Sequence, residues 1–138
     1  MVKQNDSLPV LRQLPGKNNP LGKVKFLFPN THDIYLHDTP DKTAFAKQER
    51  TLSHGCIRVA DAGKLAAWLL RDQSDWTTAK INSAMNGGKE QTVNLRAKQP
   101  VTITYLTAWI DERGQLNFRP DVYNHDKEAM EKMFASKS

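Results

Sequence analysis

Apolar and polar side chains alternate over residues 23–28, which read Lys-Val-Lys-Phe-Leu-Phe and are followed by a proline. A period of two is typical of a β-strand, and the proline would end it. The turn-forming residues 30–33 separate this segment from a second short strand over residues 34–37. Together the two segments predict a β-hairpin whose outgoing strand ends at His37.

A long polar segment, residues 38–52, follows the hairpin. It is longer than a simple connection and has the length of loops that carry binding or catalytic residues. Residues 57–59 then read Ile-Arg-Val, a brief strand-like stretch. The pattern predicts a functional loop between two strands.

Helical periodicity begins after Asp61, whose carboxylate suits the N-cap position. Residues 78–85 predict a second helix that stops at Gly87 and Gly88, because glycine is common just past a helix end. In the first helix, apolar side chains recur at helical spacing and a tryptophan widens their stripe: Ala62, Leu65, Ala66, Leu69 and Trp68.

The remaining residues predict three more strands and one helix. Strands are expected over residues 92–95 and 101–110, and a turn at residues 111–114 leads into a strand over residues 115–119. Residues 126–135 predict a terminal helix. Its inward side chains are expected to be Ala129, Met130 and Met133.

Several strands with a few helices indicate a β-rich α+β domain. The chain has 138 residues, which fits one domain with a hydrophobic core. Residues 1–22 hold three Pro and two Gly, and so predict an irregular lead-in.

The net charge of +5 permits attraction to polyanions such as nucleic acid, anionic lipid or wall polymers. The Lys and Arg residues are scattered, however, which favours a mildly basic, solvated surface. We therefore expect no nucleic-acid partner. No apolar run reaches the roughly 18 residues needed to span a bilayer, so no membrane span is expected.

Cys56 is the single cysteine, so no internal disulfide can form. A lone cysteine is often an inert core side chain, but Ser53, His54 and Gly55 are poor company for a core residue. Gly55 allows a tight turn in which main-chain N–H groups can converge on a reacting oxygen. A thiolate near an imidazole is a nucleophile, so a catalytic Cys56 is the functional alternative.

His37 ends a strand just before the loop, a position from which an imidazole can project into a cleft. The loop is long enough to return the chain and bring Cys56 beside His37. His54 could be an acid or base, a substrate contact, or a brace for the turn. A competing interpretation makes His37, His54 and Cys56 zinc ligands, although the usual paired ligand spacings are absent.

Two motifs, YLHDTP at Tyr35–Pro40 and SHGCIRV at Ser53–Val59, carry a family resemblance. They resemble the L,D-transpeptidase catalytic domains of the YkuD type, and within them the large periplasmic branch that cross-links peptidoglycan. The similarity extends from about Asn19 through Asn124. The resemblance implies a mixed-sheet β-sandwich with a few helices. It also implies a catalytic domain over residues 23–125, followed by a C-terminal helix and tail over residues 126–138.

The resemblance also implies a mechanism. Cys56 would attack a stem tetrapeptide of peptidoglycan, release D-Ala and form a thioester, which a neighbouring amine would resolve into a 3→3 cross-link. His37 would be the base, with no metal or organic cofactor. The remaining roles implied are orientation of His37 by the Asp38 carbonyl, an oxyanion hole from Gly55 and Cys56 with His54, and substrate binding by Ser53, Arg58 and Tyr35.

The implied location is the periplasm or cell envelope, although the first residues lack the apolar stretch of a signal peptide. Family domains begin with strands upstream of the matching region, so we expect a chain that lacks its first strands. The alternative function is a catalytically inactive wall-binding fragment of the same fold.

Overall fold

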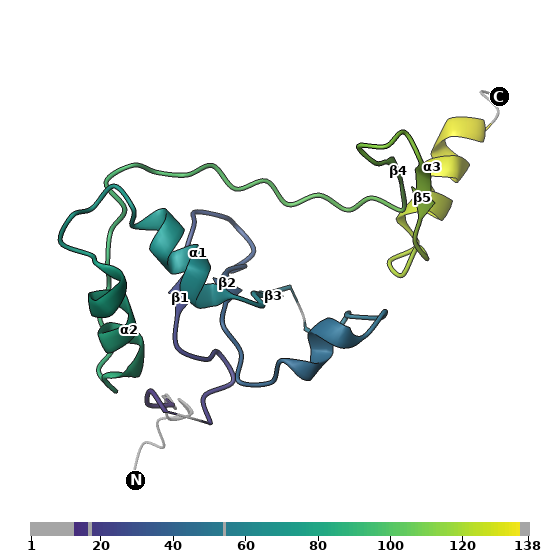
Figure 1. Cartoon of the computed structure of the whole chain (residues 1–138). Helices are drawn as coiled ribbons and strands as arrows, with labels where there is room; N and C mark the ends of the chain where they lie inside the picture. Colours follow the sequence, from purple (N-terminus) through teal and green to yellow (C-terminus); the bar gives the residue numbers. More distant parts are fainter. Residues whose placement is uncertain (1–12, 17, 54, 136–138) are drawn as a thin grey trace, which may run out of the picture. The chain divides into compact units, whose positions relative to one another are not determined.

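The structure is a computed structural model that describes residues 13–16, 18–53 and 55–135 (Figure 1). It divides into two compact units, Met1–Pro100 (unit 1) and Val101–Ser138 (unit 2). In the described ranges, α-helices and short strands are mixed in a small α/β architecture. The strands span only two or three residues each, so the β-rich character expected from the sequence is not confirmed.

Unit 1 contains a three-stranded sheet in the order β1-β2-β3. Its strands are β1 (Lys25–Phe26), β2 (Leu36–His37) and β3 (Ile57–Arg58). β1 and β2 are antiparallel, which confirms the predicted hairpin. β3 returns parallel to β2, a pairing that the sequence pattern did not predict. The loop between β2 and β3 contains a 3₁₀-helix, η1 (Thr43–Ala46).

The hairpin turn is built around Asn30. Its side-chain oxygen accepts hydrogen bonds from the backbone N–H groups of His32 (3.0 Å) and Ile34 (2.9 Å), and its amide nitrogen donates back to the carbonyl of Ile34. Asn side chains commonly organise turns in this way. The turn predicted at residues 30–33 is therefore confirmed.

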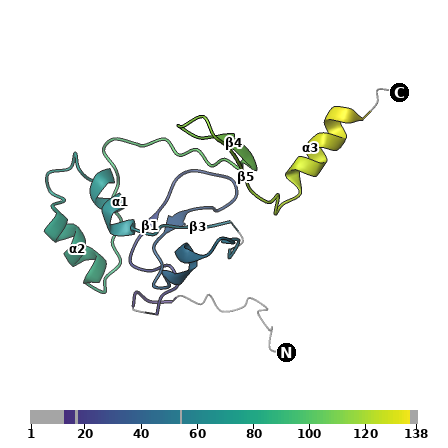
Figure 2. The ribbon, with the colours of Figure 1, turned by 45° about the vertical axis from the view of Figure 1, so that its right-hand side comes forward.

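Two helices pack together in unit 1, α1 (Ala62–Leu69) and α2 (Thr78–Asn86) (Figure 2). The Asp61 carboxylate accepts from the Lys64 N–H at 3.3 Å, which confirms the predicted N-cap. The core cluster consists of Ala66, Leu70 and Ile81, with half-buried apolar residues around it. One predicted core member is wrong: Trp68 is exposed, and its ring contacts the Arg71 guanidinium and not the core cluster.

The strand predicted over residues 92–95 is absent, and this segment is coil. Its alternation was real, since Val93 and Leu95 pack against the helical core cluster. The backbone, however, is held by a side chain: the Arg96 N–H donates to Gln73 Oε1 at 3.0 Å. The apolar period of two therefore indicated two half-buried side chains, not a strand paired with a neighbour.

Unit 2 contains the hairpin of β4 (Ala108–Ile110) and β5 (Leu116–Phe118), followed by α3 (His125–Phe134). The Asp111 turn is confirmed, with the Gly114 N–H donating to the Asp111 carbonyl at 2.9 Å. Residues 101–107 are not strand, so the predicted 101–110 strand is wrong over most of its length.

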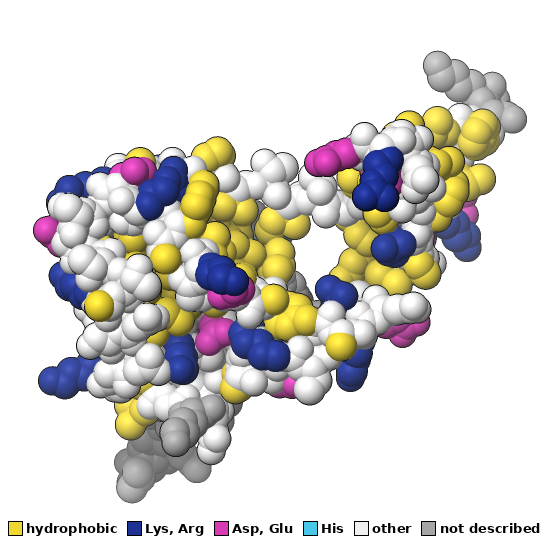
Figure 3. Space-filling model, viewed as in Figure 1, with side chains coloured by type: hydrophobic (Ala, Val, Ile, Leu, Met, Phe, Trp, Pro, Cys, Tyr) yellow, Lys and Arg dark blue, Asp and Glu magenta, His cyan; other side chains and the backbone are white. Residues whose placement is uncertain are grey.

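The helix predicted at residues 126–135 is confirmed, but its predicted inward face is wrong. Met130 and Met133 are 59% and 75% exposed, and α3 has no buried residue. Apolar side chains of unit 2 lie at its surface in Figure 3. No helix in the described ranges is both long and apolar enough to cross a membrane.

Candidate active site

The pairing of β2 with β3 places Cys56 and His37 on one face of the sheet. Leu36 lies opposite Ile57 and His37 lies opposite Arg58. Because successive side chains alternate between the two faces, His37, Cys56 and Arg58 share a face. His37 and Cys56 are 19 residues apart in the sequence, and the parallel pairing of β2 with β3 brings them close together.

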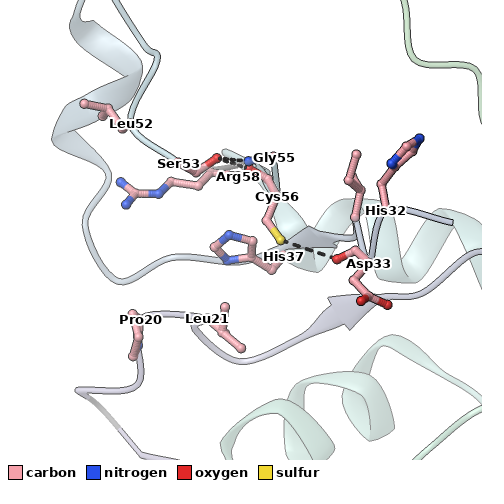
Figure 4. Close-up of a pocket in the computed structure, with 11 residues that line it drawn as sticks. Pro20, Leu21, His32, Asp33, His37, Leu52, Ser53, Gly55, Cys56 and Arg58 are labelled. Atoms are coloured by element: carbon pink, nitrogen blue, oxygen red, sulfur yellow. Dashed lines mark hydrogen bonds between the residues drawn. The ribbon is translucent and has the colours of Figure 1, made fainter. Parts of the chain in front are cut away.

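These side chains line a pocket of about 480 Å³. Figure 4 shows the Cys56 sulfur with the His37 ring on one side and Asp33 on the other. The Cys56 thiol donates to the Asp33 carbonyl across 3.9 Å, a long contact. Cys56 is half-buried, which argues against the inert core thiol that was the alternative interpretation. The other residues lining the pocket are Pro20, Leu21, His32, Asp33, Ile34, Leu52, Ser53 and Gly55.

The His37 side chain is buried and held in one orientation. Its Nδ1 lies 2.5 Å from the Asp38 carbonyl oxygen. A carbonyl oxygen only accepts hydrogen bonds, so Nδ1 carries a proton, and in the neutral ring Nε2 is then the nitrogen with the free lone pair. The ring therefore has the tautomer that a general base requires.

The turn before Cys56 depends on glycine at position 55. Gly55 has φ +144°, a backbone conformation that side chains disfavour. Ser53 Oγ donates to the Cys56 carbonyl at 2.6 Å and accepts from the Gly55 N–H at 3.3 Å. A reacting oxygen at the Gly55 N–H would have to displace the Ser53 hydroxyl. His54, an expected site residue, lies outside the described residues.

Tyr35 lies beside His37 and Cys56. Its ring meets the His37 ring edge-on, with centroids 5.9 Å apart. The pKa of Tyr35 is raised, first by the side-chain hydrogen bond with Cys56, then by burial and by the Cys56 charge. A phenol in contact with the sulfur can donate to a thiolate.

Asp33 and Gly22 are residues of this region that the sequence reasoning did not single out. Asp33 contributes its carbonyl to Cys56 and has φ +53°, uncommon outside glycine. Gly22 contacts the Asp38 side chain from a left-handed turn at φ +62°. Both positions follow turn-forming residues, Asn-Thr-His and Asn-Pro-Leu, which was the available signal.

Across the ranges that the structure describes, no group of three or more His, Cys, Asp or Glu side chains could hold a metal ion. The zinc hypothesis includes His54, which is not among those residues, so it stays a hypothesis.

A cysteine, an oriented imidazole and a glycine turn beside an open pocket are the groups that nucleophilic catalysis by cysteine uses. The family model described as "L,D-transpeptidase catalytic domain" (YkuD) matches residues 2–103. The chain belongs to this family, which confirms the resemblance noted in its motifs.

A Haemophilus influenzae (strain Rd) protein described as "Putative L,D-transpeptidase" is 38% identical to the chain over 118 residues. The matched region covers 86% of this chain and 24% of that protein. The chain thus spans about a quarter of the length of its curated relative. Family membership supports peptidoglycan cross-linking at the level of the family.

Proposed function

We propose that this chain carries a peptidoglycan L,D-transpeptidase site in which Cys56 is the nucleophile and His37 the general base. The observation that carries the proposal is their shared face on β2 and β3, with His37 Nδ1 bonded to the Asp38 carbonyl. That geometry supports proton transfer at Nε2, on the side of the ring away from Asp38.

In the first half-reaction, the Cys56 thiol gives its proton to His37 Nε2. The sulfur attacks the carbonyl carbon between the third residue of a stem tetrapeptide and its terminal D-Ala. The C–N bond breaks, the imidazolium protonates the leaving amine, and D-Ala departs. A thioester on Cys56 remains.

In the second half-reaction, an amine from a neighbouring stem attacks the thioester carbonyl. His37 takes a proton from that amine, the new C–N bond forms, and the C–S bond breaks. The proton returns to the sulfur, which regenerates the thiol and leaves a 3→3 cross-link. Neither step needs a metal or an organic cofactor.

The other site residues have supporting roles in this proposal. The N–H groups of Gly55 and Cys56, with His54, would stabilise the oxyanion once the Ser53 hydroxyl moves aside. Arg58 lines the pocket and can meet a substrate carboxylate. Tyr35 is not a lining residue of the pocket, but its hydroxyl bonds to the Cys56 sulfur and could contact substrate bound there. We assign the catalytic domain to residues 23–125, with a YkuD-type β-sandwich, and its location to the periplasm or cell envelope.

The test is release of D-Ala from a tetrapeptide stem by the purified chain, with Cys56→Ala as the control. We expect release by the wild type and none by the variant. If the wild type binds peptidoglycan but releases no D-Ala, the transpeptidase proposal is wrong. That result would favour the catalytically inactive wall-binding fragment.

A further inference from the structure

The Asp38 carboxylate belongs to the residue that follows the proposed base, His37, and is held by two donors outside the pocket. One oxygen, Oδ2, accepts from the Lys23 N–H at 3.0 Å, and the other, Oδ1, accepts from Lys42 Nζ at 2.6 Å. The carboxylate belongs to the same residue whose carbonyl binds His37 Nδ1. Its side chain is only 12% exposed. A buried carboxylate held by two donors fixes the conformation of its own residue.

The backbone of Gly22 lies close to this carboxylate. It lies in a left-handed turn, and a Cβ placed on it would overlap the Asp38 side chain. The backbone also joins the two segments here, because the Asp38 N–H donates to the Val24 carbonyl at 2.9 Å. The turn before β1 is therefore shaped around Asp38.

Lys42 connects Asp38 to the strand that follows the nucleophile. Its ammonium group donates to Asp38 Oδ1 and, at 3.4 Å, to the carbonyl of Val59, just after β3. Lys42 stands in the loop that separates His37 from Cys56 in the sequence. One ammonium group thus links the end of β2 to the end of β3.

Burial alone would raise the pKa of Asp38. The hydrogen bonds from Lys42 and from the Lys23 and Thr39 N–H groups, with the Lys42 charge, outweigh it and lower the pKa. The carboxylate is therefore ionised at neutral pH, as the ion pair requires.

We propose that the Asp38 carboxylate, seated on Gly22 and held by Lys42, is a positioning group for the catalytic base. It keeps the Asp38 carbonyl in place, so that His37 retains its proton on Nδ1 and presents Nε2 on the pocket side. Lys42 is a second positioning residue, which acts through Asp38. The inference rests on the proposed roles of His37 and Cys56.

The first test is spectroscopic. In ¹⁵N NMR spectra, the wild type should show His37 mainly as the Nδ1–H tautomer. Asp38→Asn and Asp38→Ala should increase the Nε2–H population, and Lys42→Met should do so to a smaller extent. Lys47→Met, which removes a charge from the same loop, is the matched control and should leave the tautomer unchanged. An unchanged tautomer in folded Asp38→Ala and Asp38→Asn would overturn the proposal.

The second test is the rate at which iodoacetamide alkylates Cys56. A small misplacement of a reacting group can cost up to about 100-fold in rate, so Asp38→Ala should slow alkylation by roughly 10- to 100-fold. Lys42→Met should slow it in the wild type, but change it less than about twofold in an Asp38→Ala background, because it acts through that residue. Equal effects in both backgrounds would show that Lys42 acts independently and would overturn its assigned role.

Neither measurement needs the natural substrate. If the tautomer and alkylation rate respond as expected but D-Ala is never released, the positioning role stands and the proposed function fails. If D-Ala is released at equal rates by the wild type and folded Asp38→Ala, the proposed function stands and the positioning role fails.

Discussion

Cys56 is bordered by groups of different chemistry: the imidazole of His37, the phenol of Tyr35 and the carbonyl of Asp33. The imidazole can take the thiol proton, and the phenol can donate to the sulfur once that proton has gone. The carbonyl can only accept a hydrogen bond from the thiol. The contacts of the two side chains, His37 and Tyr35, can be tested by substituting one residue at a time.

The contact between Tyr35 and Cys56 predicts a titration shift. Cys56→Ala removes the hydrogen bond and the charge that raise the pKa of Tyr35, so this pKa should fall toward its ordinary value of 10.0. Tyrosinate should then form at lower pH in the variant. The chain has three Tyr residues, so the absorbance titration is read as the difference from Tyr35→Phe in each background. An identical Tyr35 titration with and without Cys56 would contradict the contact.

If His37 is the general base, substitutions of His37 and His54 should slow D-Ala release to different extents. His37→Ala should slow D-Ala release by roughly 10²- to 10⁴-fold, the usual contribution of a general base. His54→Ala should slow D-Ala release by a smaller factor if that residue acts mainly through its backbone. Circular dichroism of both variants controls for folding. Complete loss in both, together with loss of bound zinc, would support the metal-site hypothesis instead.

At the scale of elements, α1 and α2 are stabilised by a small shared core. Ile81 is 4% exposed and packs with Ala66 and Leu70. By contrast, the apolar side chains of α3 remain exposed within unit 2. Apolar side chains in these helices therefore contribute unequally to stability, according to their burial.

A pair of substitutions measures this difference. Ile81→Ala should lower the free energy of unfolding by about 2–4 kcal/mol, because it leaves a cavity among buried side chains. Met133→Ala, at a site that is 75% exposed, should change it by about 0.5 kcal/mol or less. Urea unfolding followed by circular dichroism gives both values. A larger loss for Met133→Ala than for Ile81→Ala would contradict the burial of these two side chains.

At the scale of the whole molecule, the chain forms two units, and the active-site residues described here all belong to unit 1. No helix or strand occurs between α2 and β4 in the described ranges. Basic side chains are dispersed over the face seen in Figure 3, in line with the scattered charge of the sequence.

The irregular backbone just before the boundary between the units predicts a protease-sensitive site. Lys98 is exposed and lies in irregular backbone, so limited trypsin digestion should cut after it early. Lys64, inside α1, is the comparison and should be cut later, because proteolysis there requires unfolding of the helix. Mass spectrometry of early fragments gives the order. Early cleavage after Lys64 would show that α1 opens more readily than the irregular backbone around Lys98.

Local sequence patterns determined a large part of this protein. The SHGC motif, the hairpin that ends at His37, the Asp61 cap and the glycine stop after α2 all follow from residues near one another in the chain. Turn, cap and strand preferences act over a few residues, so they can be recognised without knowledge of the fold.

Contacts between distant residues were decided only by the tertiary structure. The parallel pairing of β2 with β3 and the link from Lys42 to Asp38 and Val59 depend on how the long loop folds back. The tertiary structure also decided the environment of residues 92–95, whose alternating apolar side chains pack against the helical core cluster and not in a strand pair. A periodic pattern predicts which side chains will be buried, whereas the residues that they pack against depend on the rest of the chain.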